Sequence, residues 1–249
     1  MKSISKFLLV AVLLSGANYT FANPPHITAK VSAANTIQDR HLSGFNAIAA
    51  SGSFDVYIVQ GNTESVKVEA PADVIDHIVT EVENGTLKIH DKHSSGWNWG
   101  SWWGNNHKKV AVYVTAKNLN AIGITGSGDV FFKDGIRASS LSLSVSGSGD
   151  VMGKVDAKSL ECDISGSGDM KLSGHAQNSS ISVSGSGDFS ARDLVTAHTS
   201  VQVSGSGDAS INASDSIEAS VSGSGDVSYT GGAQHIVKSK SGSGDISGH

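Results

Sequence analysis

The tetrapeptide Gly-Ser-Gly-Asp occurs seven times in the second half of this 249-residue chain. The steps between successive copies are 21, 19, 19, 20, 18 and 19 residues, and the copies begin at Gly126, Gly147, Gly166, Gly185, Gly205, Gly223 and Gly242. A fixed period near 20 residues is typical of a solenoid, in which each repeat forms one coil that stacks on the next. The sequence therefore predicts a β-solenoid with coils of about 19–20 residues over residues 126–249.

Apolar and polar residues alternate on both sides of each tetrapeptide. Leu143 and Val145 precede the copy at Gly147, and Val151 follows it with the same parity. Because period-two alternation indicates half-buried strands, we expect these residues to face the interior. The two glycines share this parity, which suggests that stacked backbones approach closely there. Runs such as Lys133-Asp134-Gly135 predict a turn, with a second short strand following it in each coil.

The opposite parity places one aspartate of every copy on the outside of the solenoid. Stacked coils lie ~4.8 Å apart, so neighbouring carboxylates would repel by ~1 kcal/mol in water and by roughly 3–4 kcal/mol at an effective dielectric near 20. We expect each carboxylate to be paired, splayed apart, or hydrogen-bonded to N–H groups of the turn. A turn cap is the first interpretation; a divalent-cation ladder and a ligand-facing surface are the alternatives. The ladder comprises Asp129, Asp150, Asp169, Asp188, Asp208, Asp226 and Asp245.

Charge and cysteine content exclude several classes of protein. The formal net charge is −5, with lysines and arginines scattered along the chain, so the sequence lacks the basic patch of a nucleic-acid-binding protein. Cys162 is the only cysteine, which rules out an intramolecular disulfide. Its position is equivalent to that of Leu143, and we expect a small buried core residue. No cofactor and no resident metal are expected.

The first 22 residues have the features of a secretory signal peptide. Lys2 and Lys6 precede the apolar run 7–14, and Thr20-Phe21-Ala22 offers a small-residue cleavage site. The apolar run is too short to span a bilayer, and no other stretch approaches that length. We expect a protein exported to the periplasm, the outer-membrane surface or the medium, with a flexible leader at 23–43.

Residues 44–125 are expected to form a less regular, N-terminal β section of the solenoid. Gly52-Ser53-Phe54-Asp55 is a degenerate copy of the tetrapeptide in which Phe54 replaces the second glycine. Residues 78–89 predict a hairpin around Asn84-Gly85, because Asn-Gly is the strongest short hairpin signal. Alternating valines and isoleucines on both sides of the Gln60-Gly61-Asn62 turn predict two more strands.

A loop at 94–107 contains all four tryptophans of the chain, interleaved with glycine, serine and asparagine. Aromatic faces can stack on sugars, and such rings also suit protein interfaces and membrane surfaces. The candidate ligand-binding residues are therefore Trp97, Trp99, Trp102 and Trp103. The alternative is a long hairpin whose tryptophans pack back on the sheet. His90, His93 and His107 flank the loop without a firm metal-ligand spacing, so we expect exposed, non-ligating histidines.

The last copy differs from the others at its inward positions. Lys238 and Lys240 stand where earlier coils have aliphatic residues. Inward lysines on a final coil would protect its exposed edge against end-to-end stacking.

The order of these features resembles the family of exported bacterial proteins called putative auto-transporter adhesin, head GIN domain. The resemblance covers roughly residues 44–246 and rests on Phe45-Asn46-Ala47-Ile48, Gly52-Ser53-Phe54-Asp55-Val56 with Gln60-Gly61, Gly85-Thr86-Leu87 and the repeated tetrapeptide. It implies a right-handed single-stranded β-helix, a location in the cell envelope or at the surface, and a role in adhesion. It supplies no catalytic residues, and the tryptophan-rich loop is not part of its pattern.

These observations favour a non-enzymatic, adhesin-like solenoid that binds a glycan, a surface polymer or a protein partner. One alternative is a structural envelope scaffold without a specific ligand. Another is an enzyme acting on polysaccharides, because β-helices also host lyases and hydrolases. Such an enzyme needs acids and bases in distinct environments, whereas the repeated aspartates stand in equivalent ones.

Overall fold

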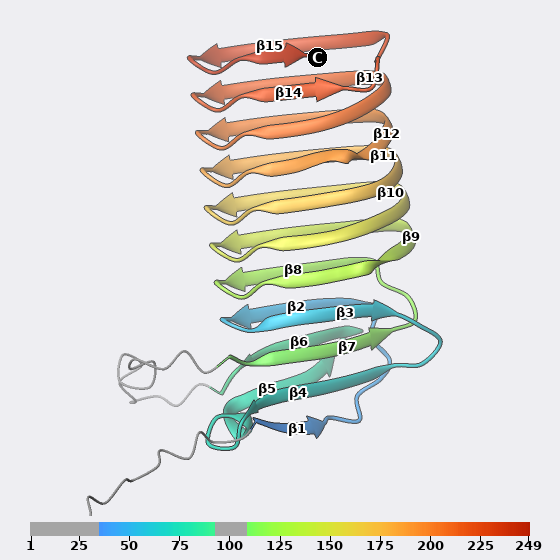
Figure 1. Ribbon diagram of the computed structural model, residues 1–249, viewed down its shortest axis with the longest axis vertical. Coiled ribbons are helices and arrows are strands. Elements are labelled where there is room, and N and C mark those ends of the chain that lie inside the picture. The colour runs from blue at the N-terminus through green and yellow to red at the C-terminus, as the bar shows by residue number, and fades with distance from the viewer. Residues whose placement is uncertain (1–34, 93–108) are drawn as a thin grey trace, which may run out of the picture. The chain divides into compact units, whose positions relative to one another are not determined.

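The computed structural model describes residues 35–92 and 109–249. Within these ranges sixteen strands form one continuous hydrogen-bonded sheet, wound into stacked coils of about 19 residues. Figure 1 shows the near strands running to the right and the far strands to the left as the chain climbs, which is the right-handed sense. The predicted β-solenoid is confirmed, and it begins well before the first full repeat.

The strands fall into an irregular N-terminal group and a regular repeat group. The first group comprises β1 (Asn35–Asp39), β2 (Ala47–Gly52), β3 (Asp55–Gln60), β4 (Ser65–Pro71), the 3₁₀ turn η1 (Ile75–His77), β5 (Ile78–Glu83), β6 (Thr86–Asp91), β7 (Ala111–Ala116) and β8 (Ala121–Gly126). The second comprises β9 (Val130–Gly147), β10 (Val151–Gly166), β11 (Met170–Gly185), β12 (Phe189–Gly205), β13 (Ala209–Gly223), β14 (Val227–Thr230), β15 (His235–Gly242) and β16 (Ile246–Gly248).

The repeat strands are longer than the sequence predicts. We expected a break and a second short strand in each coil, but β9 to β13 run on as single strands of 15–18 residues. In β10 and β11, parallel pairing continues around the bend from Val151 opposite Met170 to Gly166 opposite Gly185. Because each coil has a nearly identical neighbour, the hydrogen bonds to that neighbour can follow the backbone through the bend.

The core lies inside the coils and is built from the predicted alternate residues. Leu143, Cys162 and Ile181 occupy the same position in three successive coils, and all three are buried. Burial raises the pKa of the Cys162 thiol, so the thiol stays protonated at physiological pH. The cysteine is therefore a core residue, as the sequence predicts.

The two glycines of each tetrapeptide allow the coils to stack. Gly185 has φ 124°, a left-handed conformation that side chains disfavour. A Cβ atom on Gly187 would overlap the carbonyl oxygen of Gly168 in the preceding coil. The same overlap recurs from coil to coil, so both glycines are required by the close approach of identical backbones.

The N-terminal group is wound less simply than its sequence suggests. β3 and β4 follow each other in sequence, yet β7 lies between them, parallel to β3 and antiparallel to β4. β5 and β6 form the predicted hairpin, and Asn84 and Gly85 at its turn have φ 50° and 77°. These are the positive values that a two-residue turn of this kind requires.

Phe54 explains why the degenerate tetrapeptide departs from the others. Its side chain is buried, and its ring lies where a Cβ atom on Gly52 would be. The strand on the side of β3 away from the repeats is β7, which begins only at Ala111 and contributes no tetrapeptide turn. The position therefore accommodates a large side chain that no later coil could hold.

The final coil is covered by its own lysines. Lys238 and Lys240 lie opposite the buried Ala219 and Val221. The Lys238 Nζ lies 4.7 Å from the centre of the Tyr229 ring and donates a hydrogen bond of 3.0 Å to the carbonyl oxygen of Ile246. Lys240 lies 3.8 Å from Asp245. Charged groups thus stand where another coil would have to stack.

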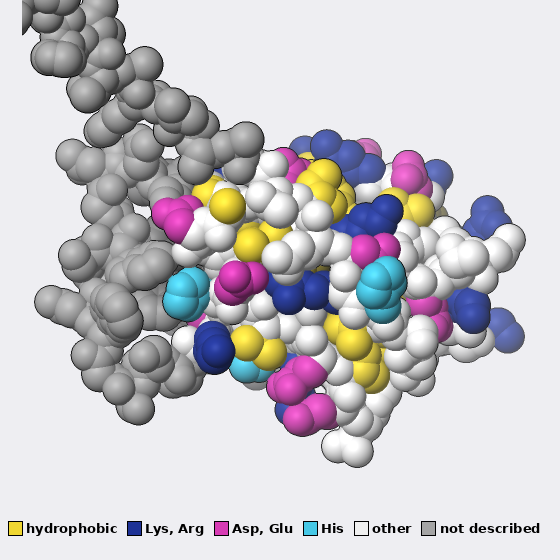
Figure 2. Space-filling model, turned by 90° about the horizontal axis from the view of Figure 1, so that it is seen from below, with side chains coloured by type: hydrophobic (Ala, Val, Ile, Leu, Met, Phe, Trp, Pro, Cys, Tyr) yellow, Lys and Arg dark blue, Asp and Glu magenta, His cyan; other side chains and the backbone are white. Residues whose placement is uncertain are grey.

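The opposite end, near β1, also lacks a continuous apolar surface. Figure 2 looks at this end and shows acidic, basic, hydrophobic and histidine side chains interspersed over its visible part. β1 adds to β4 in the antiparallel sense, which interrupts the parallel stacking of the coils. Over the described residues, the chain forms no helix long and apolar enough to cross a membrane.

Candidate functional site

The aspartate ladder is held together by main-chain hydrogen bonds. In six successive coils, the N–H group of each aspartate donates to the Oδ1 atom of the aspartate before it, as Asp188 does to Asp169 at 2.8 Å. Of the three arrangements that the sequence allowed, this is hydrogen bonding to turn N–H groups. One carboxylate oxygen of each ladder member up to Asp226 therefore has a structural role in the stacking of the turns.

Asp55, in the degenerate tetrapeptide, extends the ladder by one position. The backbone of Asp129 hydrogen-bonds to its carboxylate. Burial, and then the negative charge of Asp129, raise the pKa of Asp55, which outweighs that hydrogen bond and the nearby Lys109. No cluster of three or more potential metal ligands occurs in the described part of the chain. Cation binding by the ladder remains a prediction.

The four candidate tryptophans lie outside the described residues, as do His93 and His107. The described chain stops at Lys92 and resumes at Lys109. The proposed binding role of Trp97, Trp99, Trp102 and Trp103 therefore stays a prediction.

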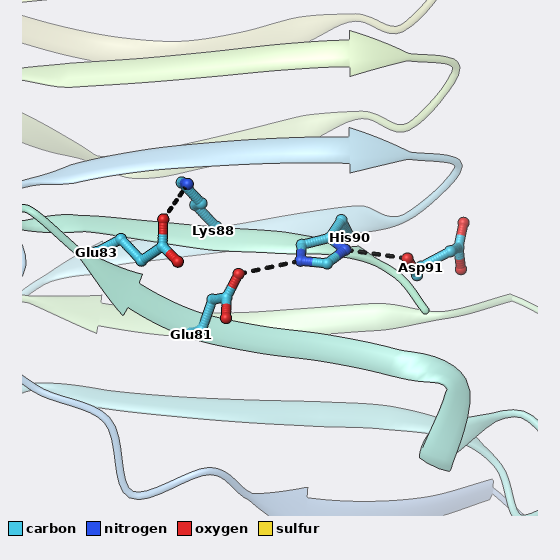
Figure 3. A network of polar contacts seen from close by, with 5 residues as sticks. All are labelled: Glu81, Glu83, Lys88, His90 and Asp91. Atoms are coloured by element: carbon cyan, nitrogen blue, oxygen red, sulfur yellow. Dashed lines mark hydrogen bonds and ion pairs between the residues drawn. The ribbon is translucent and has the colours of Figure 1, made fainter. Parts of the chain in front are cut away.

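The last described residues before this loop form a polar network on the β5–β6 hairpin (Figure 3). Lys88 donates a hydrogen bond to Glu83, and the two charges lower the pKa of Glu83 and raise that of Lys88. The His90 ring lies 3.0 Å from the carbonyl oxygen of Asp91 and 3.3 Å from Glu81. These contacts, the backbone one first, raise the pKa of His90. Both ring nitrogens are thus engaged within the hairpin.

A groove forms where the repeat coils meet the N-terminal group. Val112 and Val130 both pair with Val56, and Ala121 pairs with Ser142, so these residues mark equivalent points of two coils. From Val112 to Ala121 is 9 residues, whereas from Val130 to Ser142 is 12 residues. The bend between β7 and β8 is therefore 3 residues shorter than the bend of β9. The longer bends project beyond it and leave a step.

Two adjoining hollows of about 800 and 570 Å³ lie along this step and share Arg137, Asp156 and His175. We call them together the bend groove. Amide, hydroxyl and charged groups dominate its lining, which includes Asn118, Asn120, Ser139, Lys154, Lys158 and Gln177. Such groups can hydrogen-bond the hydroxyls of a sugar or the main chain of a peptide.

One wall of the groove is the loop 117–120, which is firmly anchored. Leu119 is buried in the core. The N–H group of Asn120 donates to the carbonyl oxygen of Asn46 at 2.9 Å, and the carbonyl oxygen of Asn120 accepts from Ser142 at 2.9 Å. The neighbouring side chains of Asn118 and Asn120 are exposed. The loop thus presents two amide groups from a fixed backbone.

A ladder of aromatic rings crosses the exposed face of β7, β3 and β9. The Tyr57 ring stacks on Tyr113 at 5.3 Å and on Phe131 at 5.2 Å between ring centres. The Nζ atom of Lys133 lies 5.9 Å from the Phe131 ring. Because the rings cover one another's faces, the middle ring offers only its edge to a ligand. We assign the ladder to coil stability, at about 0.5–1.5 kcal/mol for each pair.

The face formed by the second half of each coil presents rows of serines. Ser146, Ser165, Ser184, Ser204, Ser222 and Ser241 lie in register in six coils. Glu161 and Asp163 interrupt this face on β10. Partial burial, and then the charge of Glu161, raise the pKa of Asp163. Neighbouring acids in unlike surroundings are what the enzyme hypothesis would require, but no base faces them at this register.

The fold identifies the chain as an adhesin-type β-solenoid. The family described as putative auto-transporter adhesin, head GIN domain, matches residues 44–233, and the chain belongs to this family. A comparison with curated proteins gives no match.

Among solved structures, a putative adhesin from Bacteroides fragilis shares 27% identity with a TM-score of 0.79, over 88% of this chain and 98% of that one. A putative adhesin and a putative lipid binding protein, both from Parabacteroides distasonis, each share 24% identity over 88% of this chain and 98% of theirs, with TM-scores of 0.70 and 0.67. These last two show the fold alone.

Sequence reasoning missed the bend groove and the aromatic ladder. The ladder residues Tyr57, Tyr113 and Phe131 each follow an inward valine, and this shared position could have revealed them. The groove had no comparable signal, because it depends on which coil each bend lies beside.

Proposed function

We propose that this protein is a non-enzymatic, adhesin-like binding protein of the cell envelope that recognises a glycan or another surface polymer through the bend groove. The observation that supports the proposal is the groove itself, with its anchored loop and its exposed amide groups. Membership of a family of putative adhesins agrees with a binding role. Export by a signal peptide, and a location in the periplasm, at the outer-membrane surface or outside the cell, are part of the proposal.

The geometry of the groove suits a chain-like ligand better than a small molecule. The two hollows adjoin and extend over bends of β9, β10 and β11. An open groove buries less of a small ligand than the enclosed pockets that usually hold one. A polymer compensates by making the same weak contacts at several successive units.

The tryptophan-rich loop is a second candidate for the same ligand. Its four indole rings would add stacking on sugar faces to the hydrogen bonds of the groove. A protein partner remains an alternative occupant, since tryptophans also dominate protein interfaces.

A glycan array combined with whole-cell binding tests the proposal. We expect the protein to bind at least one glycan or cell surface, and Asn120→Ala with Gln177→Ala to weaken that binding about tenfold or more. Gln202→Ala is the matched control, because Gln202 is an exposed glutamine on the serine face of β12. The variant with all four tryptophans changed to alanine reports separately on the loop.

Circular dichroism should show the same β-sheet spectrum for every variant. If no glycan or cell surface retains the folded protein, the binding proposal fails and the scaffold alternative becomes the better description. Release of a shortened glycan during the assay would instead favour the enzyme alternative, with Glu161 and Asp163 as the first residues to change.

A further inference from the structure

The bend groove carries more positive than negative charge, although the whole chain is acidic. Its charged lining consists of Arg137, Lys154 and Lys158 against Asp134 and Asp156. The chain as a whole has a formal charge of −5. A groove of the opposite sign to its protein attracts ligands of the protein's own sign, here anions.

Arg137 is held in place through its main chain rather than its side chain. Its N–H group donates to the Oε1 atom of Gln60 at 2.8 Å, and its carbonyl oxygen accepts from the Nε2 atom of Gln60 at 3.0 Å. The same Gln60 amide also donates to the carbonyl oxygen of Lys117 at 3.2 Å. Gln60 thus ties the bend of β9 to the end of β3 and to the loop beside the groove.

This anchoring fixes the point from which the guanidinium group projects. The Arg137 side chain is 87% exposed. A side chain that leaves a fixed backbone loses less conformational entropy on binding than one on a loose loop.

The ion pair between Arg137 and Asp156 is too weak to occupy the guanidinium. The Arg137 Nε atom lies 3.6 Å from the Oδ2 atom of Asp156, and both side chains are largely exposed. Such surface pairs contribute about 0–1 kcal/mol. The terminal nitrogens of the guanidinium can still bind a carboxylate through two parallel hydrogen bonds, the geometry that arginine recognises best.

Lys154 and Lys158 lie on either side of Asp156 in the neighbouring strand β10. Each is separated from Asp156 by one residue, and all three side chains are exposed. Within the described residues neither lysine has an ion-pair partner. The three cations can therefore each meet a different acidic group of a polymer that follows the groove.

We infer that the ligand of the bend groove is an acidic polysaccharide with carboxylate groups, such as a polymer of uronic acids, and that Arg137 is its principal anion-binding residue. This inference rests on the proposed function, because it specifies the ligand class of the same groove. The exposed amides of Asn118, Asn120 and Gln177 supply the hydrogen bonds to the sugar hydroxyls.

Binding of the full protein to immobilised polygalacturonate, with dextran as the neutral polymer and heparin as the sulfated one, tests the inference. We expect polygalacturonate to be retained and dextran not, with Arg137→Gln lowering the affinity at least tenfold. Arg192→Gln is the matched control, since it removes the same charge from β12, away from the groove, and should leave the affinity unchanged. Raising the salt concentration should weaken wild-type binding, because exposed charges are screened.

Equal loss of affinity in Arg137→Gln and Arg192→Gln would overturn the inference, because it would indicate a general charge effect. Retention on heparin alone would reassign the site to sulfated polymers. Binding of a neutral glycan that is sensitive to Asn120→Ala but not to Arg137→Gln would also overturn it, while leaving the proposed function standing. Binding to no polymer in any assay would remove both.

Discussion

The repeat coils and the N-terminal group of this solenoid solve the same stacking problem in different ways. In the repeats each coil stacks on a nearly identical coil, and the tetrapeptide positions tolerate only glycine where backbones touch. In the N-terminal group the chain reverses direction, β7 inserts between β3 and β4, and Phe54 occupies a glycine position. Repetition therefore restricts the sequence, whereas the end of the repeat releases it.

The features with binding potential lie where the repetition breaks. The bend groove exists because one bend is shorter than its neighbours, and the aromatic ladder belongs to β7, β3 and β9. The tryptophan-rich loop connects β6 to β7 in sequence. By contrast, the C-terminal coils present mainly serines on both faces. The comparison suggests that the repeats extend the molecule and that the junction carries its specificity.

Gly187→Ala should have the largest effect on stability. The added Cβ atom would overlap the backbone of the preceding coil, which cannot move without disturbing the whole stack. We expect a loss of more than about 4 kcal/mol in the free energy of unfolding, or failure to fold. Urea denaturation followed by circular dichroism measures this loss.

Gly61→Ala is the control for that change, because a Cβ atom there would meet only the side-chain methyl group of Thr115 at 3.1 Å. An unfolding midpoint of Gly187→Ala equal to that of wild type would contradict the stacking argument.

Phe54→Ala tests the other side of the comparison. Because the ring is buried, its removal should cost about 3–5 kcal/mol in unfolding free energy. Tyr113→Ala, which removes a 40% exposed ring of the aromatic ladder, should cost less, about 0.5–1.5 kcal/mol. Similar losses for the two variants would show that Phe54 has no special role in closing the irregular section.

Changing Lys238 and Lys240 to Val should affect association rather than folding. The double variant would replace the charged cover of the last coil with the aliphatic residues of earlier coils, and we expect concentration-dependent oligomers. Sedimentation velocity distinguishes these from the wild-type species. Lys154→Val with Lys158→Val controls for the loss of two lysines elsewhere, and oligomers in both variants would argue against a specific end effect.

Asp188→Ala should remove one rung of the aspartate ladder. The N–H group of Asp208 would lose its acceptor, at a cost of about 1–2 kcal/mol, whereas Asp188→Asn keeps the Oδ1 atom and should cost less. If the ladder acts only as a set of turn caps, EDTA leaves the melting temperature unchanged. A clear fall in melting temperature with EDTA would instead support the cation ladder.

Asp163→Asn should have the smallest effect, and one that depends on pH. The folded protein raises the pKa of this carboxyl above its ordinary value of 3.8, so ionisation disfavours the folded state. The penalty is absent below about pH 3.8 and appears as the pH rises through the folded pKa. We expect a small stabilisation by Asp163→Asn at pH 7 that vanishes in acid. Glu218→Gln, at the register position of Glu161, should show no such pH dependence.

The regular part of the fold could be predicted because its information is local and repeated. Alternation around each tetrapeptide assigned residues such as Val145 and Ile164 to the core, and both are buried. The bends were harder, since runs such as Lys133-Asp134-Gly135 resemble hairpin turns in isolation. Only the parallel neighbour on each side keeps the strand continuous through them.

The sequence by itself determined the solenoid, its period, its glycine contacts and the family, because a repeat states the same structural rule seven times. The tertiary structure alone decided that β7 separates β3 from β4 and that Gln60 fixes Arg137, 77 residues away. It also decided that unequal bends leave a groove. The physical reason is that these features depend on contacts between segments that never repeat, so no local pattern in the chain encodes them.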